Sequence, residues 1–262
     1  MGKTMSLVEN KSRNFVTALA RGLEILRAFE PGNGLLGNQE IAERTGLPRP
    51  TVSRLTFTLC ELGYLTYNER LGKYQPATGV LALGYACLSN FGVRQVARPM
   101  MKELAEAVDA SVSLGARDRL NMVYLENVQG SGALTVRLDI ASRIPIATTA
   151  MGRAFLAALP DGERDYLLDH IRRHAGDQWP KVKAGIEQAQ RDYQEYGYCV
   201  SAGDWSRDVN AVGAPLRLPD STLVAFNCGG PSYRLSRESL HTELGPRLRQ
   251  MVRSIGMAMT HY

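Results

Sequence analysis

The stretch IAERTGLPRPTVSRL, residues 41–55, decides the fold of the first part of the chain. Ala42 and Gly46 are four residues apart, and small side chains at that spacing let two helices approach closely at a tight turn. Pro48 and Pro50 suit the start of the second helix, because its first backbone N–H groups have no intrahelical acceptor. The stretch therefore predicts a helix-turn-helix.

The second helix of this pair carries polar side chains near its start. Arginine suits guanine or a phosphate oxygen, and threonine and serine both donate and accept hydrogen bonds. An ordinary helix pair with solvated side chains is the alternative interpretation. We expect Phe57 to be partly buried rather than in contact with a thymine methyl group. The positions expected to face a DNA major groove are Arg49, Pro50, Thr51, Ser53 and Arg54.

The flanking segments favour DNA over the ordinary helix pair. A helix is expected over residues 17–29, and Asn38 is expected to cap the next one. The runs YLTY and KYQP surround the polar turn NERLG, which predicts a small hairpin. Three helices followed by a hairpin are typical of a winged helix-turn-helix. Arg70 and Lys73 in that wing are candidate phosphate contacts, although each also fits a plain surface charge.

After Ala110 the sequence pattern changes from helical to mixed helical and β-rich, which predicts a second domain. Residues 78–108 are helical in pattern, and Pro99 inside them predicts two helices or a kink. Short β-rich runs at 111–118, 121–128, 133–139 and 222–230 then alternate with helical stretches, which indicates an α+β sheet domain. The predicted organisation is a flexible tail (1–14), a winged helix-turn-helix (15–77), a linker helix (78–95) able to supply a dimer surface, and an effector and oligomerisation domain (96–262).

Composition sets weak limits on function. The formal net charge is +5, and the first 80 residues hold ten Lys or Arg against seven Asp or Glu, so a polyanionic partner is plausible but not established. Neither a signal peptide nor an apolar run of membrane-spanning length is evident. Four widely spaced cysteines suggest reduced thiols, so we expect a cytoplasmic protein without a membrane partner.

No pattern for catalysis or metal binding stands out. His170 and His174 are four residues apart, but the surrounding helix is charged on most sides and is expected to be solvated. The glycine-rich pieces match no nucleotide motif, and no nucleophile signature is present, so neither a cofactor nor a metal is expected. Three hypotheses stay open: a ligand-responsive DNA-binding regulator, an enzyme acting on the small molecule, and a winged helix that contacts only proteins.

Several ordered motifs resemble the IclR family of transcriptional regulators. The resemblance covers nearly the whole chain from about residue 15. It is carried by ALARGLEILRAF, IAERTGLPRPTVSRL, LCELGYLTYNERLGKYQPATGVLALG, SRIPIATTAMGRAFLAALP, YGYCVSAGDWSRDVNAVGAPL and VAFNCGGPSYRLSRESL.

Membership of that family implies a GAF-like α/β effector domain and dimers or dimers of dimers. It also implies repression or activation at a palindromic operator in double-stranded DNA, tuned by a small organic or aromatic acid. A two-fold dimer places its recognition helices about one DNA turn apart, which suits such an operator.

The resemblance also implies positions for the effector pocket. Compared with the usual family pattern, alanine replaces glycine at Ala141 and cysteine at Ala211, and Asp204 replaces a glutamate, so we expect a pocket of different polarity. Arg137 or Arg143 is a candidate partner for a ligand carboxylate, although solvated surface charge is the expectation for each. The implied pocket positions are Val136, Ala150, Met151, Ser201, Ala211, Asn227 and Gly229.

Overall fold

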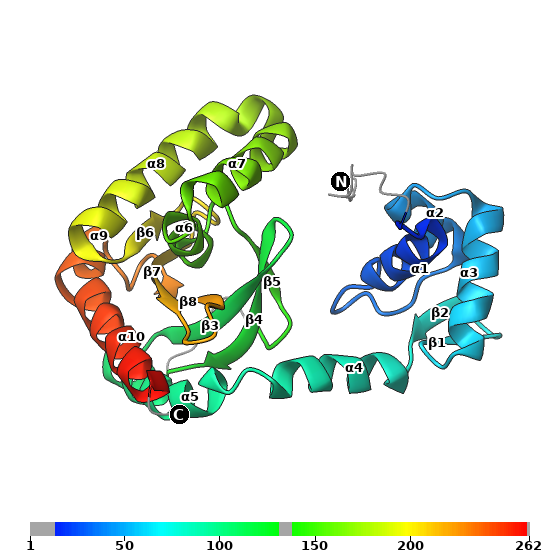
Figure 1. The fold of residues 1–262 in the computed structure, drawn as a ribbon, viewed down its shortest axis with the longest axis horizontal. Helices are drawn as coiled ribbons and strands as arrows, with labels where there is room; N and C mark the ends of the chain where they lie inside the picture. The colour runs from blue at the N-terminus through cyan, green and yellow to red at the C-terminus, as the bar shows by residue number, and fades with distance from the viewer. Residues whose placement is uncertain (1–13, 131–137, 261–262) are drawn as a thin grey trace. The chain divides into compact units, whose positions relative to one another are not determined.

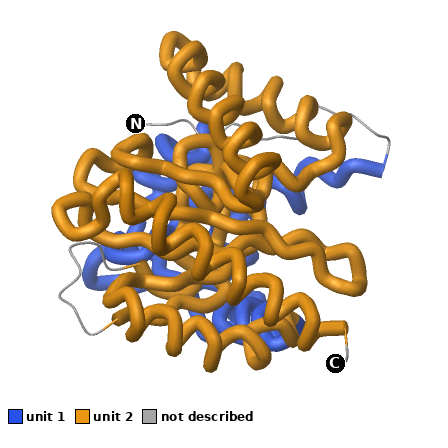
Figure 2. Tube along the Cα trace, turned by 90° about the vertical axis from the view of Figure 1, so that its left-hand side faces the viewer, with its two compact units in different colours: residues 1–90 blue, residues 91–262 orange. Residues whose placement is uncertain are grey.

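A computed structural model describes residues 14–130 and 138–260 (Figure 1). The chain divides into two compact units, residues 1–90 and 91–262 (Figure 2). The division falls within the predicted linker, residues 78–95. The predicted tail lies outside the described residues except for Asn14.

Unit 1 is a winged helix-turn-helix, as predicted. Its apolar side chains converge on a small core that includes the fully buried Ile25, Ile41 and Val52. Its first elements are α1 (Thr17–Arg27), α2 (Asn38–Thr45), α3 (Arg49–Glu61), β1 (Leu65–Asn68) and β2 (Lys73–Pro76), with the two strands paired antiparallel.

The turn between α2 and α3 follows the predicted signals, but the cap does not. Gly46 ends α2 in the left-handed region, at a φ of 71°. The prediction that Asn38 caps α2 is wrong, because Gly37 precedes the helix and donates its backbone N–H to the Glu40 carboxylate at 2.7 Å. Asn38 instead donates to Ser53 Oγ at 2.9 Å, which ties α2 to the recognition helix.

Unit 1 ends with an apolar helix, α4 (Thr78–Ser89), that has no buried residue. Its sequence TGVLALGYACLS contains no charged side chain. Leu81 is 71% exposed and Tyr85 69% exposed, one helical turn apart. A helix that is apolar all round is normally covered by other protein.

The helical region after unit 1 breaks at a different place than predicted. Helix α5 (Val93–Val108) follows α4 after residues 90–92, and Pro99 lies inside α5 on an exposed position. The expectation of a break or kink at Pro99 is therefore wrong in position. The interruption lies at residues 90–92 instead.

Unit 2 is built on a six-stranded antiparallel sheet with the strand order β5-β4-β3-β8-β7-β6. The strands predicted at 111–118, 121–128 and 222–230 are confirmed within a residue, whereas the run at 133–139 lies mostly outside the described residues. The strands are β3 (Ser111–Asp118), β4 (Asn121–Val128), β5 (Arg143–Pro145), β6 (Cys199–Ala202), β7 (Val209–Arg217) and β8 (Leu223–Pro231).

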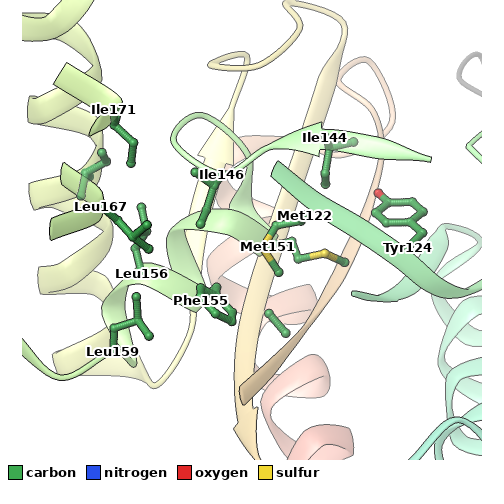
Figure 3. Close-up of a cluster of buried hydrophobic side chains, with 12 residues drawn as sticks. Met122, Tyr124, Ile144, Ile146, Met151, Phe155, Leu156, Leu159, Leu167 and Ile171 are labelled. Carbon is green, nitrogen blue, oxygen red and sulfur yellow. The ribbon is translucent and has the colours of Figure 1, made fainter. Parts of the chain in front are cut away.

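Helices cover both faces of this sheet (Figure 1). Helix α6 (Ala150–Ala157) packs on one face, with α7 (Asp161–Ala175) and α8 (Trp179–Tyr196) behind it. Helix α5 and the C-terminal helix α10 (Gly245–Thr260) pack on the other face. Figure 3 shows the apolar cluster between the sheet, α6 and α7, where Met151 lies beside Met122 of β4 and Leu156 lies beside Leu167 of α7. The α+β class is confirmed.

Candidate nucleic-acid interface and ligand cavity

The recognition helix α3 presents one continuous exposed face. Val52, Thr56 and Leu59 turn into the core of unit 1 and fix the orientation of the helix. Thr51 is half-buried beside this face. The exposed side chains recur at three- and four-residue steps and are Arg49, Pro50, Ser53, Arg54, Phe57, Thr58 and Glu61.

Phe57 differs from the expectation. Its side chain is 66% exposed rather than partly buried. It lies one turn after Ser53 on the same face of α3, because residues four apart in a helix are neighbours. The exposure of Phe57 could not be predicted from the sequence pattern, because an aromatic residue within a helical segment is more often part of a core.

The two basic residues of the wing lie in different settings. Arg70 is exposed in the turn between β1 and β2. Lys73 is half-buried, and its Nζ lies 3.1 Å from Glu40 Oε2. The Gly37 N–H and the Lys73 ammonium lower the pKa of the Glu40 carboxyl, so this acid keeps its charge and partly neutralises Lys73.

The implied pocket positions converge on one cavity between the sheet and the start of α6. Ala150, Ser201, Ala211, Asn227 and Gly229 all line it. The cavity of about 60 Å³ exceeds the roughly 10–15 Å³ that one water needs. One further implied position does not line it. The Met151 side chain is fully buried in the apolar cluster, and Val136 lies outside the described residues.

Cross-strand pairing explains how residues distant in sequence meet here. In β3, Ser113 pairs with both Asn127 of β4 and Asn227 of β8, so these three residues form a polar row across the sheet. Asn227 in turn pairs with Gly213 of β7. A Cβ at Gly213 would lie 2.3 Å from the Ala150 carbonyl oxygen, so glycine there lets α6 approach the sheet.

A second row lies two residues along the strands. Paired positions from β6, β7, β8 and β3 form it, and all four line the cavity: Ser201, Ala211, Gly229 and Ser111. The absence of side-chain bulk at Gly229 and Ala211 opens the middle of this row. Backbone register thus creates the cavity floor.

A β-bulge brings two further residues to the cavity. Gly115 pairs with Tyr124 and Leu114 with Glu126, so Leu125 is an extra residue in β4. Tyr124 and Asn127 therefore both line the cavity, although strict alternation would place them on opposite faces. Sequence analysis missed both, and it also missed Ser111, Ser113, Thr149, Trp205 and Asp208.

Three hydroxyl groups of the lining already donate within the protein. Ser113 Oγ donates to Asn127 Oδ1 at 2.8 Å, and Ser201 Oγ donates to the Thr148 carbonyl oxygen at 2.8 Å. Thr149 caps α6 by accepting from the Gly152 N–H, and its own hydroxyl donates to the Pro145 carbonyl at 2.7 Å.

The phenol of Tyr124 is neutral in this setting. Burial raises its pKa, and this effect outweighs the opposite effect of the neighbouring Asn227 and Ser113 side chains. Asn227 Oδ1 is itself buried and has no hydrogen-bond partner among the described residues.

The arginines near this region are engaged elsewhere. Arg143 lies outside the cavity, with its Nη2 3.7 Å from Asp118 Oδ2, and Arg137 lies outside the described residues. The buried Arg153 of α6 holds Asp204 at 2.7 Å and donates to backbone carbonyls. Asp204 therefore stabilises the fold through its ion pair with Arg153.

Neither a metal centre nor a membrane span is found within residues 14–130 and 138–260. No group of three or more His, Cys, Asp or Glu side chains is placed to hold a metal ion there. The His170 ring contacts Tyr166 of its own helix in a tilted arrangement, with ring centroids 4.4 Å apart. Helices in the described ranges are too short or too polar to cross a bilayer.

Both halves of the chain match models of known protein domains. Residues 18–69 match the IclR helix-turn-helix domain, and residues 85–257 match the C-terminal domain of the bacterial transcriptional regulator IclR. The HTH-type transcriptional regulator TsaQ1/TsaQ2 of Comamonas testosteroni is 37% identical over 98% of this chain and 93% of its own.

Solved structures agree with these matches. An IclR family transcriptional regulator from Brucella abortus is 52% identical, with a TM-score of 0.90 over 97% of this chain and 96% of its own. An IclR homologue from Microbacterium hydrocarbonoxydans, complexed with 4-hydroxybenzoate, shares the fold at 19% identity, with a TM-score of 0.69 over 94% of this chain and 100% of its own. The chain therefore belongs to the IclR family of DNA-binding transcriptional regulators, which is not a family of enzymes.

Proposed function

We propose that this chain is a ligand-responsive repressor or activator whose binding to a palindromic operator is modulated by a small organic or aromatic acid. The observation that carries the proposal is a polar-lined cavity in the same chain as a helix-turn-helix with an open recognition face. Residues 15–77 would bind DNA, 78–95 would link, and 96–262 would bind the effector and assemble. The chromosome of a bacterium lies in its cytoplasm, so the regulator would act there.

The proposed DNA contacts come from α3 and the wing. Arginines on an exposed face of a recognition helix suit guanine edges and phosphates, and wing cations suit phosphates. The exposure of Phe57 adds an apolar contact suited to a thymine methyl group. The contact residues proposed are Arg49, Pro50, Thr51, Ser53, Arg54, Phe57, Arg70 and Lys73.

The DNA face is tested with the Arg54→Ala variant and duplex DNA from upstream of the chain's own gene. We expect Arg54→Ala to weaken binding about 5- to 100-fold without lowering the melting temperature, because the side chain lies outside the core. Arg172→Ala is the matched control, since Arg172 is exposed on α7. Equal affinity of Arg54→Ala and wild type would remove this face from the interface.

The salt dependence of that titration separates the remaining hypotheses. Contacts to phosphates release counterions, so log Kd should vary linearly with log salt concentration. If duplex DNA is not bound at any salt concentration, the winged helix contacts proteins instead. Turnover of a cavity ligand by the purified protein would favour the enzyme hypothesis.

The proposed effector site is the cavity at the start of α6. Unpaired N–H groups in the first turn of a helix attract anions, which suits a ligand carboxylate near Ala150. The 4-hydroxybenzoate bound by the Microbacterium homologue supports an aromatic acid as one candidate. The proposed positions that line the cavity are Ala150, Ser201, Ala211, Asn227 and Gly229. Val136 stays a proposed position outside the described residues, and Met151 is no longer one, because its side chain lies in the apolar cluster.

A thermal-shift screen with small organic and aromatic acids, including 4-hydroxybenzoate, tests this site. A ligand at 100 times its Kd stabilises the fold by about 2.7 kcal/mol, which raises the melting temperature measurably. Ala211→Leu is expected to abolish the shift, because Ala211 lines the cavity and a larger side chain there would fill it. Absence of stabilisation by every acid would contradict the proposed effector class.

The exposed apolar face of α4 supports a homodimer, or a dimer of dimers. Leu81 and Tyr85 lie on one side of a helix without charges, and a second copy of the same helix is a matching apolar partner. Part of α1 shares this character, since Leu19 is 62% and Leu23 51% exposed.

A further inference from the structure

One large apolar side chain is exposed on the recognition helix. Among the residues of α3, all of which the structure describes, it is that of Phe57, which is 66% exposed. Leu55 and Cys60 of the same helix pack against the core of unit 1, whereas Phe57 stands outside that core. An aromatic ring gains free energy by leaving water, so this position favours contact with a partner.

The spacing of the exposed residues places Phe57 on the base-reading face. Pro50, Ser53, Arg54 and Phe57 lie at the steps i, i+3, i+4 and i+7 and are all exposed. A recognition helix in the major groove can read base edges with side chains at these steps. The next exposed position one turn further is the acidic Glu61, which opposes close approach to phosphates. The base-reading face therefore ends at Phe57.

Arg54 and Phe57 form a neighbouring pair on this face. They are three residues apart, which is about 4.5 Å along the helix axis, close to the roughly 3.4 Å between base pairs. An arginine suits the edge of a guanine, and an aromatic ring suits an apolar group. In a helix that lies along the groove, the two side chains therefore reach neighbouring base pairs.

The phenyl ring of Phe57 can recognise a methyl group on a base. The ring has no hydrogen-bond donor or acceptor, so it does not read the polar groups of a base edge. The apolar group of the major groove is the methyl on C5 of a pyrimidine, which thymine and 5-methylcytosine carry and which uracil and cytosine lack. Burying one carbon group of this size changes an affinity about fourfold.

We propose that Phe57 selects a pyrimidine with a 5-methyl group next to the guanine read by Arg54, so that 5-methylcytosine is accepted in place of thymine. The inference rests on the proposed DNA-binding function and narrows the operator. DNA binding by this chain would then respond to cytosine methylation at that position, a signal that is separate from any effector in unit 2.

The first step of the test identifies the base. The full-length protein selects duplexes from a random-sequence library, and the enriched sequences are compared between variants. Wild type should enrich a thymine next to a guanine. Phe57→Ala should keep the guanine and lose the preference for that thymine. Tyr166→Ala, at an exposed aromatic residue of α7, is the control and should select the wild-type sequence.

The second step changes single methyl groups in the selected duplex, in both half-sites. Thymine is compared with uracil, and 5-methylcytosine with cytosine opposite guanine, so the members of each pair differ only by the methyl group. Kd values are measured by fluorescence anisotropy at one salt concentration. For wild type, the methylated member should bind about tenfold more tightly in each pair, because each half-site contributes about fourfold. For Phe57→Ala, the members should bind within about twofold of each other.

The outcomes separate this inference from the proposed function. Equal affinities of wild type within either pair would overturn the inference, while the selected sequence would leave the proposed DNA binding standing. A methyl preference that is unchanged in Phe57→Ala would also overturn the inference, because another residue would then read the methyl group. If wild type enriches no sequence and binds no duplex, the proposed DNA binding is wrong as well.

Discussion

At Ala141, where the chain departs from the family pattern, alanine adopts an unfavourable backbone conformation. Its φ is 70°, in the left-handed region where a Cβ is unfavourable, and its N–H donates to the Tyr124 carbonyl at 2.8 Å. Glycine adopts this conformation freely, which explains physically why the resemblance leads one to expect glycine there.

Ala141→Gly should therefore stabilise the protein by up to about 1 kcal/mol, measured as the free energy of unfolding in urea. The control is Ala77→Gly, the same change at a φ of −96°, where no gain is expected. A loss of stability in Ala141→Gly would show that this turn is not strained.

The buried thiol of Cys228 makes a pH-dependent contribution to stability. Burial raises its pKa from 9.0 to about 12, because the thiolate would lose its hydration. The contribution is fully present below pH 9 and is lost as the pH rises toward 12.

Between pH 8.5 and 10, wild type should lose about 1 kcal/mol more unfolding free energy than Cys228→Ala, as measured by urea unfolding at each pH. Cys87→Ala, at an exposed position, is the control and should follow wild type. Parallel pH curves for wild type and Cys228→Ala would contradict the assignment.

At the scale of single residues, the sequence predicts which side of a helix a residue lies on better than whether another element covers that side. Arg49, Ser53 and Arg54 are exposed on one helix face because Val52 and Leu59 must turn inward. The exposure of Phe57 was unpredictable, since it depends on whether any other element covers that face of α3.

At the scale of elements, a charged cluster joins α5 to the sheet. Glu126 of β4 is buried, and its Oε2 lies 3.1 Å from Arg94 and 3.4 Å from Arg98. The next residue, Asn127, lines the cavity and donates its backbone N–H to Glu126 at 3.3 Å. The cluster therefore fixes one wall of the cavity against the helix that follows the linker.

Glu126→Gln should lower the free energy of unfolding by about 2 to 3 kcal/mol, because two guanidinium groups lose their counter-ion. Glu106→Gln, which removes an exposed pair with Lys102 at 3.8 Å, should cost less than about 0.5 kcal/mol. Equal, small costs for the two variants in thermal unfolding would show that burial does not strengthen the cluster.

Element patterns explain which strands the sequence could reveal. β4 combines two valines with a tyrosine, which favours a strand, whereas β7 contains Gly213 and Pro215, which are uncommon inside strands. The cavity was harder still. The cavity depends on strand register and on the bulge at Leu125, and local residue preferences predict neither of them.

At the scale of the whole molecule, the first proposal to test is that two copies of the chain associate through α4. Leu81→Glu on the apolar face of α4 should shift the proposed dimer toward monomer in light-scattering measurements, since burying an unpaired carboxylate is costly. Tyr166→Glu, on exposed α7, is the control and should leave the mass unchanged. A dimer of unaltered stability in Leu81→Glu would place the interface elsewhere.

The central claim is that one chain couples a ligand in unit 2 to DNA binding by unit 1. The most direct measurement is the Kd for a fluorescent operator duplex, with and without the acid that stabilises the protein most, at one fixed salt concentration. A coupling of the usual size, about 1 to 3 kcal/mol, predicts a 5- to 150-fold change in Kd, and the DNA should change the affinity for the acid by the same factor. An acid that binds the cavity and leaves the Kd for DNA unchanged would contradict the account.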